Sequence, residues 1–140
     1  YQHISIRCAA SPGDHGSTFG GNPLGSAVGR ASLRVILEED LSARADVLGS
    51  WLGNALRSAD LPHVDHVRGK GLMIGVVIRD ESGPARPFCE ALMRRGILAK
   101  ETHHQVVRLA PPLVVSKEIL EEALQTIVPV LQGEGVDLTT

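Results

Sequence analysis

Aromatic residues and cysteines are scarce in this sequence. Aromatic side chains make up 3% of its 140 residues, so a core must come mainly from Leu, Val, Ile and Ala within a hydrophobic fraction of 43%. The two cysteines, Cys8 and Cys89, lie far apart and form no CxxC pair. A disulfide framework is therefore not expected, and a reducing, cytoplasmic compartment is favoured.

An excess of charge and a long apolar run are missing as well. The formal net charge of −2 gives neither the basic surface that nucleic acid requires nor an acidic tail. No apolar run approaches the ~20 residues that span a bilayer, and residues 1–10 lack the order of a signal peptide. We expect about one domain with no nucleic-acid or membrane partner. Because the chain starts at Tyr1 rather than Met, we expect a trimmed product or a piece of a longer protein.

Two helices are predicted before any strand. Asn22, followed by a proline, is typical of a helix N-cap. The apolar residues that follow, at positions 24, 27, 28, 31 and 35, share one helical face. A second helix with one apolar face is expected over residues 41–59, with Asp40 or Ser42 as its cap.

Two pairs of short strands are predicted later in the chain. Residues 64–67 alternate between apolar and polar side chains. Residues 72–78 are almost continuously apolar and rich in β-branched side chains, which is typical of a strand buried on both faces. Residues 97–99 and 106–110 form the second predicted pair.

Two further helices complete the predicted order. A short helix over residues 88–95 stops at Gly96. Ser116 caps the last helix, whose apolar side includes Leu131, and Pro129 inside this pattern predicts a kink or an early end. The order of two helices, two strands, a helix, two strands and a helix predicts an α/β or α+β fold in which helices cover a small sheet.

The stretch HGSTFGGNPLG precedes the first predicted helix and is a candidate anion site. Ser17 and Thr18 supply hydroxyls, the glycines expose backbone amides, and a helix N-terminus favours negative charge. The stretch is not a P-loop, because no Gly-Lys-Ser/Thr follows it. A plain turn with a helix cap explains the same residues, so both interpretations stay open.

Arg108 is the second candidate. It lies among apolar residues in a predicted strand that ends at two prolines. A guanidinium there needs a carboxylate or phosphate partner, because burying it unpaired is costly. A fork for a substrate carboxylate, a structural ion pair and an outward-facing edge residue remain equally open.

The lysines and histidines form no catalytic or metal-binding set. Lys70 sits in a glycine turn, Lys117 lies near a helix start, and Lys100 leaves a strand into a polar loop. None has the desolvated setting of a nucleophilic lysine. His103 and His104 are adjacent, which on a strand points them to opposite faces, and no acidic or cysteine partner completes a ligand set. We expect no metal site and no nucleophile.

Three stretches, in order, resemble the class III, fold-type I pyridoxal-phosphate aminotransferases. They are HGSTFGGNPLG before a long helix, VRGKGLMIGVVI, and GILAKETHHQVVRLAPPLVVSKEILEEAL. The second resembles the strand that opens the C-terminal domain of that family, and the third resembles the end of that domain. Residues 99–113 are most similar to the ornithine-specific group, since acetylornithine relatives usually carry a different stretch before the arginine. The resemblance covers roughly residues 12–131.

The resemblance implies roles for three residues. Ser17 and Thr18 would reach across a dimer interface to the phosphate of pyridoxal 5'-phosphate in the partner subunit. Arg108 would bind a carboxylate of the amino acid or of 2-oxoglutarate, for which a bidentate fork is suited. Lys100 aligns with a family lysine that is not the Schiff-base lysine. The Schiff-base lysine lies upstream of the matched region in this family, so no catalytic residue is expected here.

The resemblance also implies a division of the chain. Residues 1–21 would be a remnant of the large domain with its phosphate-binding loop, and residues 22–40 a connector helix. Residues 41–132 would be the α+β C-terminal small domain, and residues 133–140 a loose tail. The whole enzyme would convert ornithine and 2-oxoglutarate to glutamate semialdehyde and glutamate, and this chain would be inactive alone.

Other interpretations remain. The chain would equally serve as a non-catalytic module that docks on a separately encoded large domain. It would also suit a fragment of an aminotransferase for acetylornithine or 4-aminobutyrate, or a decayed remnant. The residues before position 12 do not resemble the family, which is typical of a split or frameshifted gene.

Overall fold

Four α-helices and one four-stranded antiparallel sheet make up residues 16–138, the part of the chain that the computed structural model describes. The elements are α1 (Pro23–Glu38), α2 (Leu41–Ser58), β1 (Val64–Lys70), β2 (Met73–Ile78), the 3-10 turn η1 (Asp80–Ser82), α3 (Arg86–Arg94), β3 (Lys100–Thr102), β4 (Val106–Leu109) and α4 (Lys117–Leu131). The predicted order and the mixed α/β class are confirmed. Within these residues, no helix combines the length and the apolarity needed to cross a membrane.

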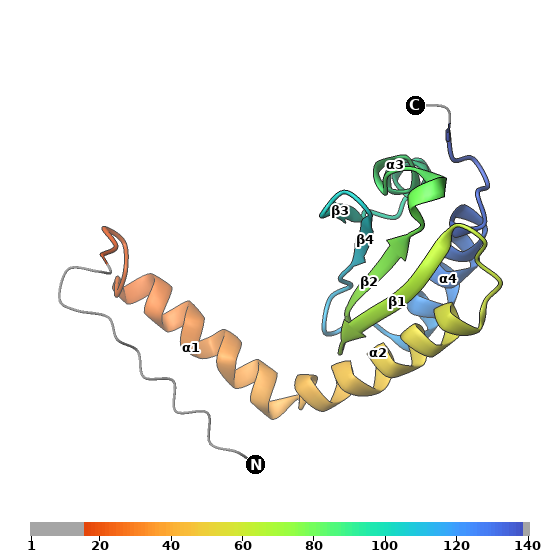
Figure 1. The fold of residues 1–140 in the computed structure, drawn as a ribbon. Helices are drawn as coiled ribbons and strands as arrows, with labels where there is room; N and C mark the ends of the chain where they lie inside the picture. Colours follow the sequence, from red (N-terminus) through yellow and green to blue (C-terminus); the bar gives the residue numbers. More distant parts are fainter. Residues whose placement is uncertain (1–15, 139–140) are drawn as a thin grey trace, which may run out of the picture.

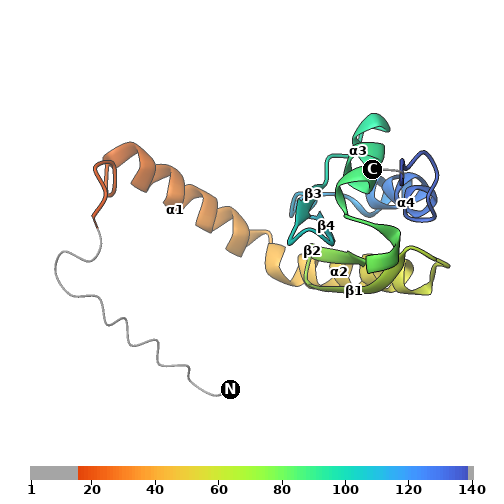
Figure 2. The same ribbon diagram turned by 45° about the horizontal axis from the view of Figure 1, so that its top comes forward.

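Helix α1 extends away from the rest of the molecule in both views (Figures 1 and 2). Its predicted cap is confirmed, because Asn22 Oδ1 accepts a hydrogen bond from the Gly25 amide at 2.8 Å. None of its residues is buried, although it carries a row of apolar side chains. The apolar face of α1 therefore has no partner within the described residues.

A single residue forms the corner between α1 and α2. Asp40 has a left-handed φ of 47°, and its carbonyl accepts the first hydrogen bond of α2 from the Arg44 amide at 3.1 Å. Its side chain makes no capping bond, and Ser42 already lies inside the helix. Asp40 therefore occupies the predicted N-cap position, whereas Ser42 does not, and Asp40 caps α2 through its backbone carbonyl and not through its carboxylate.

The sheet has the strand order β1-β2-β4-β3, and every neighbouring pair is antiparallel. A two-residue turn at Gly71 and Leu72 joins β1 to β2, and Lys70 pairs with Met73 across it. Gly71 has a φ of +54°, a conformation that the first residue of such a hairpin turn favours and that glycine adopts without strain. This turn fixes the register of the first two strands.

The hydrophobic core lies on one face of the sheet. Ile74, Val76 and Ile78 of β2 are buried, whereas Met73 on the other face is 62% exposed. The prediction of a strand buried on both faces is therefore wrong. The reason is that α2, α3 and α4 all pack in one core on the same face and leave the opposite face without a helix (Figure 1). The largest fully buried side chains are Phe88, Leu52, Leu56, Ile78, Leu92, Leu131, Val76, Val107 and Val130.

The third strand lies later in the chain than predicted. Residues 97–99 are not a strand, since β3 spans Lys100–Thr102. The Ile97 amide donates to the Leu92 carbonyl at 3.0 Å, so this segment completes the end of α3 before the ladder begins. Gly96, with a φ of +85°, ends α3 as expected.

The last helix begins at the expected residue, but it does not end early at Pro129. Ser116 Oγ accepts a hydrogen bond from the Ile119 amide at 3.3 Å, which confirms the cap. Pro129 lies in the last turn, and the helix ends soon after it, at Leu131.

The segment after α4 turns back onto the molecule. The Glu134 amide donates to the Pro129 carbonyl at 3.0 Å. Arg94 donates to the Gly135 carbonyl at 2.9 Å, and Val136 packs against the core. These contacts hold the chain to α3 and α4 as far as Val136.

Helix α2 and the β1–β2 hairpin touch through their backbones. A Cβ atom added to Gly49 of α2 would overlap the carbonyl of Gly71 in the hairpin turn. Only a residue without a side chain permits this approach, so Gly49 sets the distance between the helix and the hairpin.

Replacing Gly49 by alanine should separate these two elements. We expect Gly49→Ala to lower the free energy of unfolding by about 1–3 kcal/mol or more, because the added methyl overpacks a backbone contact. Urea unfolding followed by circular dichroism measures the change. Gly29→Ala is the matched control, since a Cβ atom there meets nothing within 4 Å and lies in a helix. Equal losses for both variants would contradict the proposed role of Gly49.

Cys89 should be inert in the folded chain. It is 5% exposed, and burial raises the pKa of its thiol from 9.0 to about 11. In a Cys8→Ser variant, we expect the native Cys89 thiol to react with a disulfide reagent at pH 8 more than about 100-fold slower than in urea.

The Cys89 thiol loses its proton at lower pH in the unfolded chain than in the folded one, so the free energy of unfolding should fall as pH rises from 9.0 to about 11. Fast labelling without denaturant would contradict this assignment.

Candidate functional site

The loop that carries Ser17 and Thr18 is exposed and lies directly before α1. Ser17 Oγ accepts a hydrogen bond from the Gly20 amide at 2.9 Å, so its own hydrogen remains available to donate. Asn22 closes the loop by donating to the Phe19 carbonyl at 2.6 Å. The Thr18 hydroxyl has no partner among the described residues.

This loop suits one side of a phosphate group. Both hydroxyls can donate, and they stand at the end of α1 where the helix dipole is positive. All residues of the loop are exposed to solvent, so the loop would supply only part of a phosphate site. Other donors would have to come from outside these residues.

Arg108 lies on β4, in the interior of the sheet, and its side chain is exposed. Its neighbours in the strand, Val107 and Leu109, are buried in the core. Because side chains alternate along a strand, Arg108 points to the face that no helix covers. The arginine is therefore an outward-facing residue, but it does not lie on an edge strand.

Strand register places two further cations beside Arg108. Across β2, Gly75 pairs with Arg108 on one side and with Arg68 of β1 on the other, and on β3 Lys100 pairs directly with Arg108. We call Arg68, Arg108 and Lys100 the cationic row. Neighbouring strands lie about 4.8 Å apart, so the three charges line up across the open face with only Gly75 between two of them.

No described side chain neutralises the cationic row. Arg68, Arg108 and Lys100 form no ion pair or side-chain hydrogen bond within residues 16–138. Like charges directly opposite on a ladder, as in the pair of Lys100 and Arg108, are destabilising. An anion on this face would relieve that repulsion, and the Arg108 guanidinium can hold a carboxylate with two parallel hydrogen bonds.

The two candidate sites are far apart in this chain. Ser17 and Thr18 lie before the start of α1, while Arg108 lies in the sheet beyond the other end of that helix (Figure 1). The 16 residues of α1 alone span about 24 Å. One copy of the chain therefore does not bring the loop and the arginine into a single pocket.

All three lysines are exposed. Lys70 forms an ion pair with Asp46 at 3.0 Å, and Lys117 forms one with Glu121 at 2.9 Å. Lys100 lies on the edge strand β3. None of the three has the dry, enclosed environment that makes a lysine amine nucleophilic.

The four histidines among the described residues complete no metal-ligand set. His103 and His104 are in the turn between β3 and β4 rather than on a strand, with φ of 51° and 64°. His63 Nδ1 contacts Ser82 Oγ at 3.0 Å, and His66 contacts the neighbouring aspartate. Among residues 16–138, no group of three His, Cys, Asp or Glu side chains could hold a metal ion.

The aminotransferase class-III family matches residues 3–131 of the chain, so the expectation that the residues before position 12 do not resemble the family is wrong. The ornithine aminotransferase of an Exiguobacterium species is 53% identical over 126 residues, which cover 90% of this chain and 31% of that protein. The chain therefore spans about a third of the length of this curated relative.

Two solved structures share the fold. That of Plasmodium falciparum ornithine delta-aminotransferase matches with a TM-score of 0.80 and 35% identity, over 89% of this chain and 33% of its own. That of acetylornithine aminotransferase from Elizabethkingia anophelis matches with a TM-score of 0.73 and 41% identity, over 89% of this chain and 32% of its own. The fold is thus shared by relatives named for two different amino donors.

Reversing one charge in the cationic row should stabilise the chain. In Lys100→Glu, the new carboxylate lies directly opposite Arg108, so we expect a gain of about 0.2–1 kcal/mol in the free energy of unfolding. Lys100→Gln only removes the repulsion, so it should raise the free energy of unfolding by less. Urea unfolding at low and at 1 M salt tests the cause, since screening should shrink both gains. A loss of stability in Lys100→Glu would contradict a direct electrostatic interaction between the side chains at positions 100 and 108.

Proposed function

Because this chain belongs to the class-III aminotransferases, we propose that it is the C-terminal portion of an enzyme that transfers the δ-amino group of ornithine to 2-oxoglutarate. The observation that carries the proposal is its 53% identity to a relative named ornithine aminotransferase. The match covers 90% of this chain but 31% of that protein, which supports a portion rather than a whole enzyme. The products would be glutamate semialdehyde and glutamate.

In this proposal, Arg108 binds and orients a substrate carboxylate. Its guanidinium is on the uncovered face of the sheet and has no partner among the residues described. A planar fork fixes both the position and the orientation of a carboxylate, which a single ammonium group does not. Arg68 and Lys100 add positive charge on either side and would attract anionic substrates toward Arg108.

The cofactor would be pyridoxal 5'-phosphate. When bound, this group supplies the electron sink for amino-group transfer. The hydroxyls of Ser17 and Thr18 would donate to its phosphate. Because these hydroxyls lie beyond α1 from Arg108, we propose that they serve the partner subunit of a dimer while Arg108 serves a different pocket.

We propose that the chain contains no catalytic residue and is inactive alone. The support is that Lys70, Lys100 and Lys117 are all exposed, and two of them are engaged in ion pairs. A lysine that bonds a carbonyl cofactor requires a desolvated or strongly activated amine.

A second candidate function is a docking module for a large domain made as a separate chain. The unburied apolar face of α1 favours it. Leu24 is 75% exposed, Val28 56% and Val35 42%, although a helix usually buries such a face. Co-purification with a separately encoded aminotransferase domain, without turnover, would support this alternative.

The amino donor itself is a further choice. The acetylornithine aminotransferase structure is 41% identical to this chain, against 35% for the ornithine delta-aminotransferase structure. Ornithine is proposed on the curated relative and on the stretch around Arg108, and an acetylornithine enzyme is the alternative. The donor preference has to be measured in a complete enzyme.

A chimera tests both the function and the arginine. Residues 16–131 of this chain would replace the matching third of the Exiguobacterium enzyme, and turnover would be measured with ornithine and with acetylornithine. We expect ornithine turnover. Arg108→Gln should lower kcat/KM about 10–100-fold, because a charge-assisted fork is lost. The kcat/KM of Arg108→Lys should lie between those of Arg108→Gln and the unsubstituted chimera, since lysine keeps the charge but cannot form two parallel hydrogen bonds.

Arg30→Gln on α1 is the matched control for removing one positive charge, since Arg30 is exposed and makes no ion pair among the described residues. A chimera that binds the cofactor and prefers acetylornithine would overturn the assignment of ornithine. Unchanged kinetics in Arg108→Gln would overturn the role of the arginine.

A further inference from the structure

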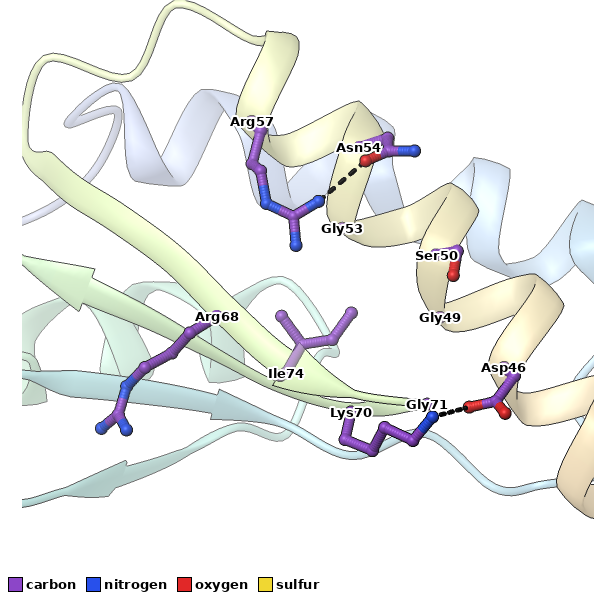
Figure 3. Close-up of a pocket in the computed structure, with 11 residues that line it drawn as sticks. Asp46, Gly49, Ser50, Gly53, Asn54, Arg57, Arg68, Lys70, Gly71 and Ile74 are labelled. Carbon is purple, nitrogen blue, oxygen red and sulfur yellow. Dashed lines mark hydrogen bonds and ion pairs between the residues drawn. The ribbon is translucent and has the colours of Figure 1, made fainter. Parts of the chain in front are cut away.

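A polar groove lies between α2 and the β1–β2 hairpin, on the core side of the sheet edge. Its volume is about 410 Å³, within the range of small-molecule sites. Figure 3 shows the α2 side chains lining one wall and the hairpin forming the other. The lining residues that matter here are Asp46, Ser50, Asn54, Arg57 and Lys70.

Glycines line the groove on both walls. Gly49 and Gly53 lie one turn apart on α2, and Gly69 faces them from β1. A Cβ atom at Gly53 would lie 3.2 Å from Arg57 Nη2, so the missing side chain leaves room for that guanidinium. The backbone contact of Gly49 with Gly71 holds one end of the groove closed, so the space persists beside a fixed helix.

One guanidinium is held over this space. Arg57 Nη1 donates to Asn54 Oδ1 at 2.8 Å, and Arg57 Nε donates to the Val67 carbonyl at 3.3 Å. These bonds anchor two of its three nitrogens. Nη2 has no partner among the described residues, and Figure 3 shows the guanidinium extending from α2 toward Ile74.

The charge in the groove is positive. Arg57, Arg68 and Lys70 line it, against the single carboxylate of Asp46. Lys70 and Asp46 neutralise each other at 3.0 Å. The side chain of Arg68 points away in Figure 3, toward the face that carries the cationic row. Arg57 is therefore the unneutralised charge that faces the groove, and Ser50 on the same helix is the hydroxyl among the lining residues.

We propose that this groove binds a small molecule through an oxyanion, a phosphate or a carboxylate, held by Arg57 Nη2 and the Ser50 hydroxyl. An anchored arginine with a free nitrogen is suited to oxyanions, because the ordering of its side chain is already complete. The site lies on the other side of the sheet from Arg108, and the proposed aminotransferase reaction makes no use of it.

Anion titration of the full 140-residue chain tests the proposal. Inorganic phosphate and succinate would each be added to isotope-labelled protein at constant ionic strength, with sodium chloride as the reference. We expect saturable NMR shifts at the Arg57 Nε–H and at the amides of Gly53 and Gly69. The anion with the lower dissociation constant indicates whether the groove prefers a phosphate or a carboxylate.

Four variants make the result specific. Arg57→Gln should weaken binding at least tenfold, while Arg34→Gln on α1 removes the same charge and should leave it unchanged. Gly53→Ala is a second probe, since its Cβ atom would sit 3.2 Å from Arg57 Nη2 and crowd the guanidinium, so it too should weaken binding, though less. Arg108→Gln should have no effect, which separates this site from the proposed function.

Several outcomes would overturn the proposal. Shifts that match those of sodium chloride would show general screening. Equal affinity in Arg57→Gln and the unsubstituted chain would remove the arginine from the site. Shifts centred on Gly75 and lost in Arg108→Gln would assign the anion to the cationic row instead.

Discussion

The contact between the backbones of Gly49 and Gly71 is the constraint on which the rest of the structure depends. It joins the middle of α2 to the turn of the β1–β2 hairpin. The positive φ of Gly71 in turn sets the register of β1 against β2, and β4 pairs with β2 in that same register. The alignment of Arg68, Gly75 and Arg108, and the groove below Arg57, both follow from this docking.

The two faces of the sheet have different roles because all the packed helices lie on one of them. The buried face supplies stability through aliphatic side chains and Phe88, and it encloses Cys89 so tightly that its thiol keeps its proton. The open face carries cations that no described residue neutralises. In the proposed function this face would receive substrate, since amino acids and oxo acids each carry a carboxylate.

Local features of the fold could be predicted from sequence, and features set by tertiary packing could not. The caps at Asn22 and Ser116 and the stop at Gly96 depend on neighbouring residues, so their sequence signals were sufficient. The one-sided burial of β2 depends on where three helices pack. The cationic row depends on register: alternation places Arg68 on a strand face, but only pairing through Gly75 brings it next to Arg108. The anchoring of Arg57 needs the carbonyl of Val67, which sequence spacing does not reveal.

The most direct test of the account is a turnover assay with ornithine, 2-oxoglutarate and added pyridoxal phosphate. It would compare the purified chain alone with the chain mixed with a polypeptide that supplies the remaining two thirds of an ornithine aminotransferase. The account predicts no glutamate semialdehyde from the chain alone and steady production from the mixture. Turnover by the chain alone would contradict it, because the exposed lysines described here would then have to perform the chemistry.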